Sequence, residues 1–355
     1  MNPPSPPHPT IILPTAHSES RPVAHDDDEH GQTHWVSRAA FPLIGAGLVL
    51  SQTALGFALF YGWIWLAIPL VILVSHFMHG ALIGFHEASH GMLRKNRLLN
   101  EVDGVLAGVL SFMSFTLYRA AHQTHHMHLA TERDEELWPF VNVKASLWSR
   151  RLAAAIELNL GLLFTPFLFW RIFFRKDSLI RSRKVRRRIW LEFWMLVGFW
   201  TAVLTAVAWS GTWLYFTWVF LVPGLIAGNL QSWRKYIEHV GLSGHTARSA
   251  TRSIVADTWS GRLLSLTLLH EPFHGVHHLK AGLPHYELPL HAHSLEPAAE
   301  GEMKPFPNYR SALKHLLQNL SDPRVGSHWP DTRPHAASPH AASHPVPTAH
   351  HVPQS

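Results

Sequence analysis

Residues 269–279 of this chain read Leu-His-Glu-Pro-Phe-His-Gly-Val-His-His-Leu, with histidines at positions 274, 277 and 278. On a helix, positions i, i+3 and i+4 share one face, so these three imidazoles can converge on one point. The same spacing recurs in His-Gln-Thr-His-His at residues 122–126, and His86 and His90 have the i, i+4 spacing. With 29 histidines in 355 residues, chance produces two such triplets only roughly 0.02 times per chain. The clusters therefore predict a metal site.

The composition favours a membrane protein. Hydrophobic residues make up 47% of the chain and charged residues only 15%, and there are 15 Trp and 19 Phe. Low charge with abundant aromatic side chains is typical of chains that lie in a bilayer. The chain has no cysteine, which excludes thiolate-ligated haem, cysteine-ligated iron–sulfur clusters and disulfides. The polar, Pro-rich start does not have the pattern of a cleavable signal peptide.

Four segments are long and apolar enough to cross a membrane. Ala39–Phe60 and Trp63–Phe85 are each near the ~20 residues that a spanning helix needs, and only two residues separate them, so they predict a tight helical hairpin. Ile189–Trp209 and Thr212–Leu230 predict a second hairpin of the same kind. The shorter apolar stretch Val102–Tyr118 predicts a half-buried or interfacial helix.

The charges between these segments predict their orientation. Nine basic residues and one acid lie between Arg171 and Arg188. By the positive-inside rule this run is a cytoplasmic loop and not a nucleic-acid site, whereas the hairpin turns at Tyr61 and Ser210 carry no Lys or Arg. The apolar segment Ile156–Phe174 must then return to its starting side as a re-entrant or interfacial helix. Four spans place all three histidine clusters on the cytoplasmic side.

The ends of the chain differ from the rest. Residues 1–36 are rich in Pro, His and acidic residues and predict a disordered tail, because such a segment buries too little apolar surface to offset its entropy. Residues 321–355 become a low-complexity Pro-His-Ala-Ala-Ser pattern and predict a second tail. The expected membrane domain is therefore residues 37–320.

The candidate metal ligands exceed the needs of one ion. A zinc site takes three or four protein ligands, so nine imidazoles suit two metals with open positions. Imidazole ligation suits zinc, copper, iron and nickel, and iron is favoured because a site facing apolar substrate can use oxygen to attack unreactive C–H bonds. The nine candidates are His86, His90, His122, His125, His126, His239, His274, His277 and His278.

Carboxylates near the clusters are candidates to orient these rings and raise their basicity. They are Glu87, Asp134, Glu238 and Glu271, and for each of them an ordinary capping or solvated acid is the alternative. Five further histidines lie near the clusters but off the tightest spacing and are left out of the predicted set. They are His128, His270, His285, His291 and His293, of which His270 is the nearest to qualifying, four residues before His274.

These motifs resemble the three histidine boxes of the membrane fatty-acid desaturase superfamily, the integral-membrane di-iron enzymes. His86-Glu-Ala-Ser-His90-Gly is similar to the first box, and Tyr118-Arg119 followed by residues 122–126 is similar to the second. His274-Gly-Val-His-His278-Leu, followed by Pro284-His-Tyr-Glu-Leu-Pro289, resembles the third box and its trailing pattern. Glu238-His239-x-Gly241 resembles a segment that contributes a further histidine in related enzymes. The resemblance covers roughly residues 41–291.

The resemblance implies an all-α fold with four transmembrane helices, interfacial helices and a cytosolic helical cap that holds two irons. It also implies that O2 is consumed in removing two hydrogens from a fatty-acyl chain carried by a lipid or thioester. A separate electron donor of the ferredoxin or cytochrome b5 type, with its reductase, is expected because no segment is left to form a fused haem domain. The basic residues 181–188 are a hypothetical docking site for an acidic donor.

Two rival functions stay open at this stage. A hydroxylase, or a carotenoid ketolase or hydroxylase of the same superfamily, would use the same metal site on another substrate. A membrane metal transporter would place its histidines at mid-membrane depth, whereas these clusters fall at span ends or outside the spans. Chain length, double-bond position and geometry, carrier and oligomeric state are not indicated by the residues.

Overall fold

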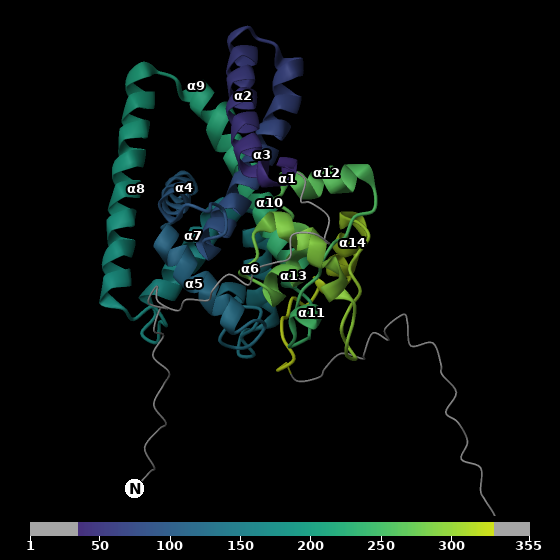
Figure 1. Ribbon diagram of the computed structural model, residues 1–355. Coiled ribbons are helices and arrows are strands. Elements are labelled where there is room, and N and C mark those ends of the chain that lie inside the picture. The colour runs from purple at the N-terminus through teal and green to yellow at the C-terminus, as the bar shows by residue number, and fades with distance from the viewer. Residues whose placement is uncertain (1–34, 330–355) are drawn as a thin grey trace, which may run out of the picture.

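The computed structural model describes residues 35–329, and within this range every regular element is a helix (Figure 1). An isolated parallel bridge joins Ile254 and Phe306. The helices are α1 Trp35–Arg38, α2 Ala40–Phe60, α3 Ile64–His90, α4 Arg97–Leu110, α5 Phe115–Met127, η1 Glu135–Leu137, α6 Leu147–Asn159, α7 Gly161–Phe174, α8 Arg183–Ser210, α9 Trp213–Tyr215, η2 Phe216–Leu221, α10 Val222–His239, α11 Ala247–Ala250, α12 Trp259–Thr267, η3 Glu271–Phe273, α13 His274–Leu279, η4 His285–Leu295 and α14 Tyr309–Asn319.

Four helical segments have the length and hydropathy of membrane spans, which confirms the predicted all-helical fold class. They are α2, α3, α8 and the continuous run Trp213–His239, which comprises α9, the π-helical turn η2 and α10. Each is 21 to 28 residues long, about 30 Å or more at 1.5 Å per residue, which matches the hydrocarbon core. Their outward faces carry large apolar side chains such as Leu50, Ile72 and Trp194.

Short turns join the spans in two consecutive pairs, as the linkers predict. Helix α2 packs along α3, whereas α8 diverges from α10 below its turn and contacts the second run through Trp200, which lies against Phe216 and Phe220 (Figure 1). Gly62 and Gly211 have positive φ angles of 71° and 67° at the two turns, a conformation that glycine adopts without a Cβ penalty. Both turns lie at the same end of the molecule, and the short helices that follow α10 gather at the opposite end (Figure 1). The ends of α3 and α10 that carry histidines therefore face the same cap.

The stretch 102–118 is two helices and not the single interfacial helix that its composition predicts. Helix α4 ends at Leu110, and α5 begins at Phe115 at an angle of 101° to it. Phe112 has a positive φ of 59° at the break, and the Ser114 side chain accepts a hydrogen bond from Leu117 N–H at the start of α5. The serine cap favours a new helix start here, which redirects the chain toward the histidine cluster of α5.

The predicted re-entrant segment 156–174 also contains a helix break. Helix α6 ends at Asn159 and α7 begins at Gly161, with Leu160 between them in a non-helical conformation. The Asn229 side chain of α10 accepts from Gly161 N–H at 2.9 Å and donates to Asn159 O at 2.8 Å, which holds the break against the span. At 14 residues α7 is too short to cross, in agreement with an interfacial or re-entrant path.

The packed domain extends past the predicted boundary at residue 320. Val325 is fully buried, its N–H donates to Phe140 O at 3.0 Å, and the Trp329 indole donates to the same carbonyl at 3.1 Å. Residues 321–329 are therefore part of the domain, because their apolar side chains fill the core beside α6 and α14, whereas the low-complexity pattern begins only later. The predicted tails 1–36 and 321–355 otherwise lie outside the described residues, apart from Trp35 and Val36 in α1.

Candidate metal centre

Four elements from distant parts of the chain bring the nine predicted histidines together. The last turn of α3 carries His86 and His90, and α5 carries His122, His125 and His126. Helix α10 ends at His239, and α13 supplies His274, His277 and His278. Each set lies on one helical face because of its i, i+3, i+4 spacing. The nine rings separate into two adjacent groups.

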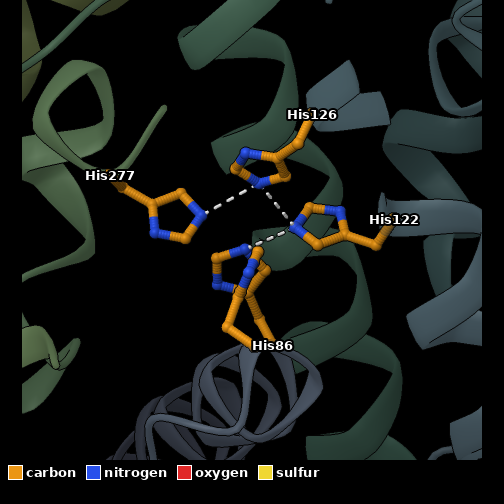
Figure 2. A group of neighbouring side chains, drawn as sticks. His86, His122, His126 and His277 are labelled. Atoms are coloured by element: carbon orange, nitrogen blue, oxygen red, sulfur yellow. Dashed lines mark hydrogen bonds between the residues drawn. The ribbon is translucent and has the colours of Figure 1, made fainter. Parts of the chain in front are cut away.

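The five-histidine group consists of His86, His90, His122, His126 and His277, whose ligand nitrogens all lie within 4.8 Å of one another. Four of these rings converge on a common point (Figure 2). The Nε2 atom of His122 lies 2.8 Å from that of His86 and 3.2 Å from that of His126, and the Nε2 atoms of His126 and His277 are 3.1 Å apart. Two nitrogens bound at right angles to one ion, at roughly 2.0–2.1 Å each, are also about 3 Å apart.

The four-histidine group consists of His125, His239, His274 and His278. The nitrogens of His125, His239 and His278 lie within 4.8 Å of one another. The Nε2 atom of His274 is 2.8 Å from that of His239 and 3.0 Å from that of His278. The two groups are in contact, because the rings of His126 and His278 stack with their centroids 4.2 Å apart.

In four of the nine rings the outward-facing Nδ1 atom meets an acceptor. His122 Nδ1 lies 2.8 Å from Glu136 Oε2, and His125 Nδ1 lies 2.9 Å from both oxygens of Asp134. In the same way, His274 Nδ1 is 3.0 Å from Glu271 Oε1, and His239 Nδ1 is 3.2 Å from the carbonyl of Ala250. A carboxylate or carbonyl oxygen can only accept, so Nδ1 carries the proton in these rings and Nε2 presents its lone pair.

Two lone pairs therefore face each other at 2.8 Å between His239 and His274. Burial lowers the pKa of His274 to about 4, so this ring is neutral near pH 7 and has no second proton to place between the two nitrogens. Burial also lowers the pKa of His277 and His278 well below the usual value, and neighbouring histidines add to the effect. Neutral rings with converging lone pairs are the donor set that a cation requires.

The four predicted carboxylates all lie beside the histidines, but in different ways. Asp134 and Glu271 contact Nδ1 atoms as described, and Glu87 Oε1 lies 3.8 Å from His86 Nδ1. Glu238 instead faces the lone-pair side of His274, with Oε2 at 3.6 Å from Nε2, and pairs with Arg234 at 2.7 Å. The role of these four carboxylates in orienting metal-binding histidines stays a prediction.

Glu136 is a site residue that the sequence pattern missed. It lies in η1, is buried, and holds the Nδ1 proton of His122. The acidic run 132–136 follows the second histidine cluster, but spacing alone does not distinguish which acid turns inward. Asp134 and Glu136 are two positions apart, and the short 3-10 turn directs both toward α5.

The charges around the two groups are unbalanced when the rings are neutral. Five carboxylates lie beside the histidines, and one guanidinium, that of Arg234, pairs with two of them. Burial raises the pKa of Glu136, and Asp134 outweighs burial to raise the pKa of His125. A bound cation would favour the ionised carboxylates and the neutral imidazoles, and would offset the buried negative charge. The residues therefore fit a metal site.

The five omitted histidines lie outside both groups. His270 and His285 are buried and their ring centroids are 6.1 Å apart, but neither belongs to a set of converging ligand atoms. His291 and His293 lie in η4, where the two rings are 5.9 Å apart, and His128 caps the end of α5. The i, i+3, i+4 spacing selected eight of the nine converging histidines, and His239 was selected by its place at the end of a span. His270 also has the i, i+4 spacing with His274, yet it lies outside both groups.

A cavity adjoins the five-histidine group. It has about 680 Å³ of empty space, including its open mouth, and lies between α3, α5, α7 and α10. Its wall includes Phe85, Phe169 and Tyr118, and the Tyr118 ring stacks on His122 with the centroids 5.3 Å apart. Glu136 and Arg234 form part of the same wall. A molecule in this cavity would lie against Tyr118 and Glu136, two side chains that contact His122.

The fold and the site define a helical membrane protein with a histidine-rich candidate metal centre. Residues 62–307, which contain all nine histidines, match the family model described as "Fatty acid desaturase". The chain belongs to the fatty acid desaturase family, so the predicted resemblance is confirmed. A "Fatty acid desaturase" of Bacillus subtilis (strain 168) is 24% identical over 273 residues, which cover 72% of this chain and 74% of the relative. Membership makes the protein an oxidoreductase that desaturates, with a fatty-acyl substrate.

Proposed function

We propose that the protein is an oxygen-dependent desaturase of fatty-acyl chains in which the nine histidines hold two irons. The observation that carries this proposal is the pair of Nε2 lone pairs of His239 and His274, 2.8 Å apart with both Nδ1 protons engaged elsewhere. A shared cation accounts for this arrangement. Iron is favoured over zinc because desaturation is an oxidation and zinc has no redox chemistry.

The protein side chains would bind and orient the metals. The five-histidine group offers one ion five nitrogens, and the four-histidine group offers the other ion four, with Glu238 beside it. Asp134, Glu136 and Glu271 would fix the ring orientations through the Nδ1 protons and raise the basicity of the bound nitrogens. When bound, the irons supply the oxygen-activating chemistry that breaks C–H bonds.

The cavity beside His122 would hold the acyl chain. Phe85, Leu162 and Phe169 supply apolar wall, and small-molecule sites are typically lined by such side chains. The Tyr118 ring separates this space from the His122 face. The chain would be either lipid- or thioester-linked, and its apolar carbons would exclude water from the reacting methylenes.

The orientation and the electron supply complete the proposal. The basic run between α7 and α8 favours a cytoplasmic position for the metal centre and both tails. Electrons would come from a separate ferredoxin or cytochrome b5 type donor with a reductase. The hydroxylase and ketolase alternatives share the same centre. Metal transport is less well supported, because His86, His90 and His239 lie at the ends of their spans.

The proposal is tested by the lipid profile of a host that expresses the wild type, His277→Ala or His293→Ala. His293 is exposed and belongs to neither histidine group, so its variant is the matched control. We expect a new double bond with the wild type and with His293→Ala, and none with His277→Ala. A new hydroxyl or keto group would move the protein to the rival class. Wild-type protein without iron and without any new product would contradict the proposal.

A further inference from the structure

One buried carboxylate lies between the two histidine groups. Glu271 Oε1 is 3.0 Å from Nδ1 of His274, which belongs to the four-histidine group. Its other oxygen, Oε2, is 3.3 Å from Nδ1 of His86, which belongs to the five-histidine group. The side chain is 1% exposed, so solvent does not compete for either oxygen. The same residue thus faces one ring from each group.

The contact between Glu271 and His86 is supported by the surroundings of both atoms. His86 Nδ1 and Glu271 Oε2 are buried, and neither makes a hydrogen bond to another group within residues 35–329. Glu87 Oε1 lies farther from the same nitrogen, at 3.8 Å. Buried polar atoms are rarely left without a partner. These two atoms can satisfy each other with a small rotation of the carboxylate.

The other carboxylates that hold Nδ1 protons serve one group each. Glu136 contacts His122 of the five-histidine group, and Asp134 contacts His125 of the four-histidine group. In the ion pairs and hydrogen bonds of the described chain, neither acid contacts a histidine of the other group. The structure therefore contains two single-group carboxylates against which Glu271 can be compared.

Two features hold Glu271 in this position. The Arg234 guanidinium donates to Glu271 Oε1 and also pairs with Glu238, so the carboxylate is anchored to α10. Leu269 and His270, the two residues before it, both have positive φ angles, 49° and 54°. Non-glycine residues rarely adopt this conformation, and backbone strain of this kind is concentrated at functional sites. The turn directs Glu271 inward immediately before the third histidine cluster begins.

We propose that Glu271 is a positioning residue shared by both metals, which orients His86 for one ion and His274 for the other. This inference rests on the two-metal centre proposed above. Removal of a single-group carboxylate should weaken the binding of one ion, whereas removal of Glu271 should weaken the binding of both ions. A carboxylate has two acceptor oxygens, but a glutamine has one acceptor and one donor. Glu271→Gln therefore keeps the side-chain size and loses the ability to accept from two Nδ1–H groups.

The test is a titration of the full-length, metal-free protein with Co²⁺, followed through the visible absorption of the bound ion. We expect two binding steps for the wild type. Glu136→Gln should weaken only the step of the five-histidine group, and Asp134→Asn only that of the four-histidine group, each by about 10–100-fold. Glu271→Gln should weaken both steps by about the same factor. Circular dichroism of each variant checks that the helices are retained.

The outcomes separate this inference from the proposed function. Fewer than two bound ions in the wild type would contradict the two-metal centre itself. Two wild-type steps, of which Glu271→Gln weakens only one or neither, would overturn the shared role and leave the two-metal centre standing. If Glu271→Gln does not fold, Glu271→Asp replaces it. Its side chain is one methylene shorter, which withdraws both oxygens from the Nδ1 atoms of His86 and His274, so both steps should again weaken, and an effect on one step alone would count against the proposal.

Discussion

At the scale of single residues, the third histidine cluster depends on a glycine as well as on its histidines. Gly275 follows His274, and its N–H donates to Ser253 Oγ at 2.8 Å. A Cβ at this position would lie 2.8 Å from Ser253 Oγ and 2.8 Å from Leu295 Cδ2, closer than such atoms normally approach. The absence of a side chain thus allows α13 to pack against the segment that follows α11.

Gly275→Ala is expected to reduce iron content and double-bond formation together. The added methyl group would clash with its buried neighbours, and overpacking of this kind costs about 1–3 kcal/mol of stability. Movement of α13 to remove the clash would shift His274 and His277. Iron analysis of the purified protein and lipid profiles of the host measure the two effects. Gly282→Ala is the matched control, because a Cβ there meets nothing within 4 Å. Equal behaviour of the two variants would show that the packing at Gly275 is unimportant.

At the scale of elements, a buried acid on a spanning helix fixes the helix that carries the second histidine cluster. Glu192 of α8 accepts hydrogen bonds from Ser114 Oγ at 2.7 Å, Thr116 N–H at 2.8 Å and Thr116 Oγ1 at 2.6 Å, all at the start of α5. Arg188, one turn earlier, donates to the same carboxylate at 3.0 Å. A carboxylate at a helix N-terminus satisfies free N–H groups and favours the helix dipole.

Glu192→Ala is expected to lower the thermal stability of the protein. It leaves buried donors of Ser114 and Thr116 without an acceptor, and each unsatisfied group costs about 1–3 kcal/mol. The midpoint of thermal unfolding in detergent, followed by circular dichroism, measures the loss. Glu296→Ala, at an exposed position outside the spans, should change the midpoint little. A midpoint for Glu192→Ala as high as that of the control would rule out this role of the carboxylate.

At the scale of the whole molecule, the arrangement of the spans decides which side of the membrane holds the metal centre. The α2–α3 turn and the α8–α9 turn lie at one end, and the histidine-bearing ends of α3 and α10 point toward the cap at the other (Figure 1). The start of α8, with Arg183 and Lys184, lies at the same end as the cap. If that end is cytoplasmic, both turns are external.

Single-cysteine labelling tests this topology without interference, because the chain has no cysteine of its own. Tyr61→Cys and Ser210→Cys should react with a membrane-impermeant maleimide on intact cells. Lys184→Cys should react only after the membrane is permeabilised. All three positions are exposed in the structure, so accessibility in the folded protein is comparable. Labelling of Lys184→Cys on intact cells would show that the orientation is the reverse of the one expected.

The sequence by itself determined the features that depend on neighbouring residues. Apolar runs near 20 residues mark the four spans, and the i, i+3, i+4 spacing marks the histidines that share a helix face. Such periodic signals lie within one element, so they can be read before the fold is known. Breaks are harder to place from composition, because an apolar stretch such as 102–118 does not indicate where Phe112 and Ser114 turn the chain.

Only the tertiary structure decided how these elements combine. His126 and His277 are 151 positions apart in the chain, yet their Nε2 atoms are 3.1 Å apart. The division of nine histidines into groups of five and four, the inward turn of Glu136 and the place of Glu271 between both groups follow from the packing of α3, α5, α10 and α13. The inclusion of residues 321–329 in the core has the same origin. Side chains that converge from separate helices leave no local pattern in the sequence, because their partners are chosen by packing and not by spacing.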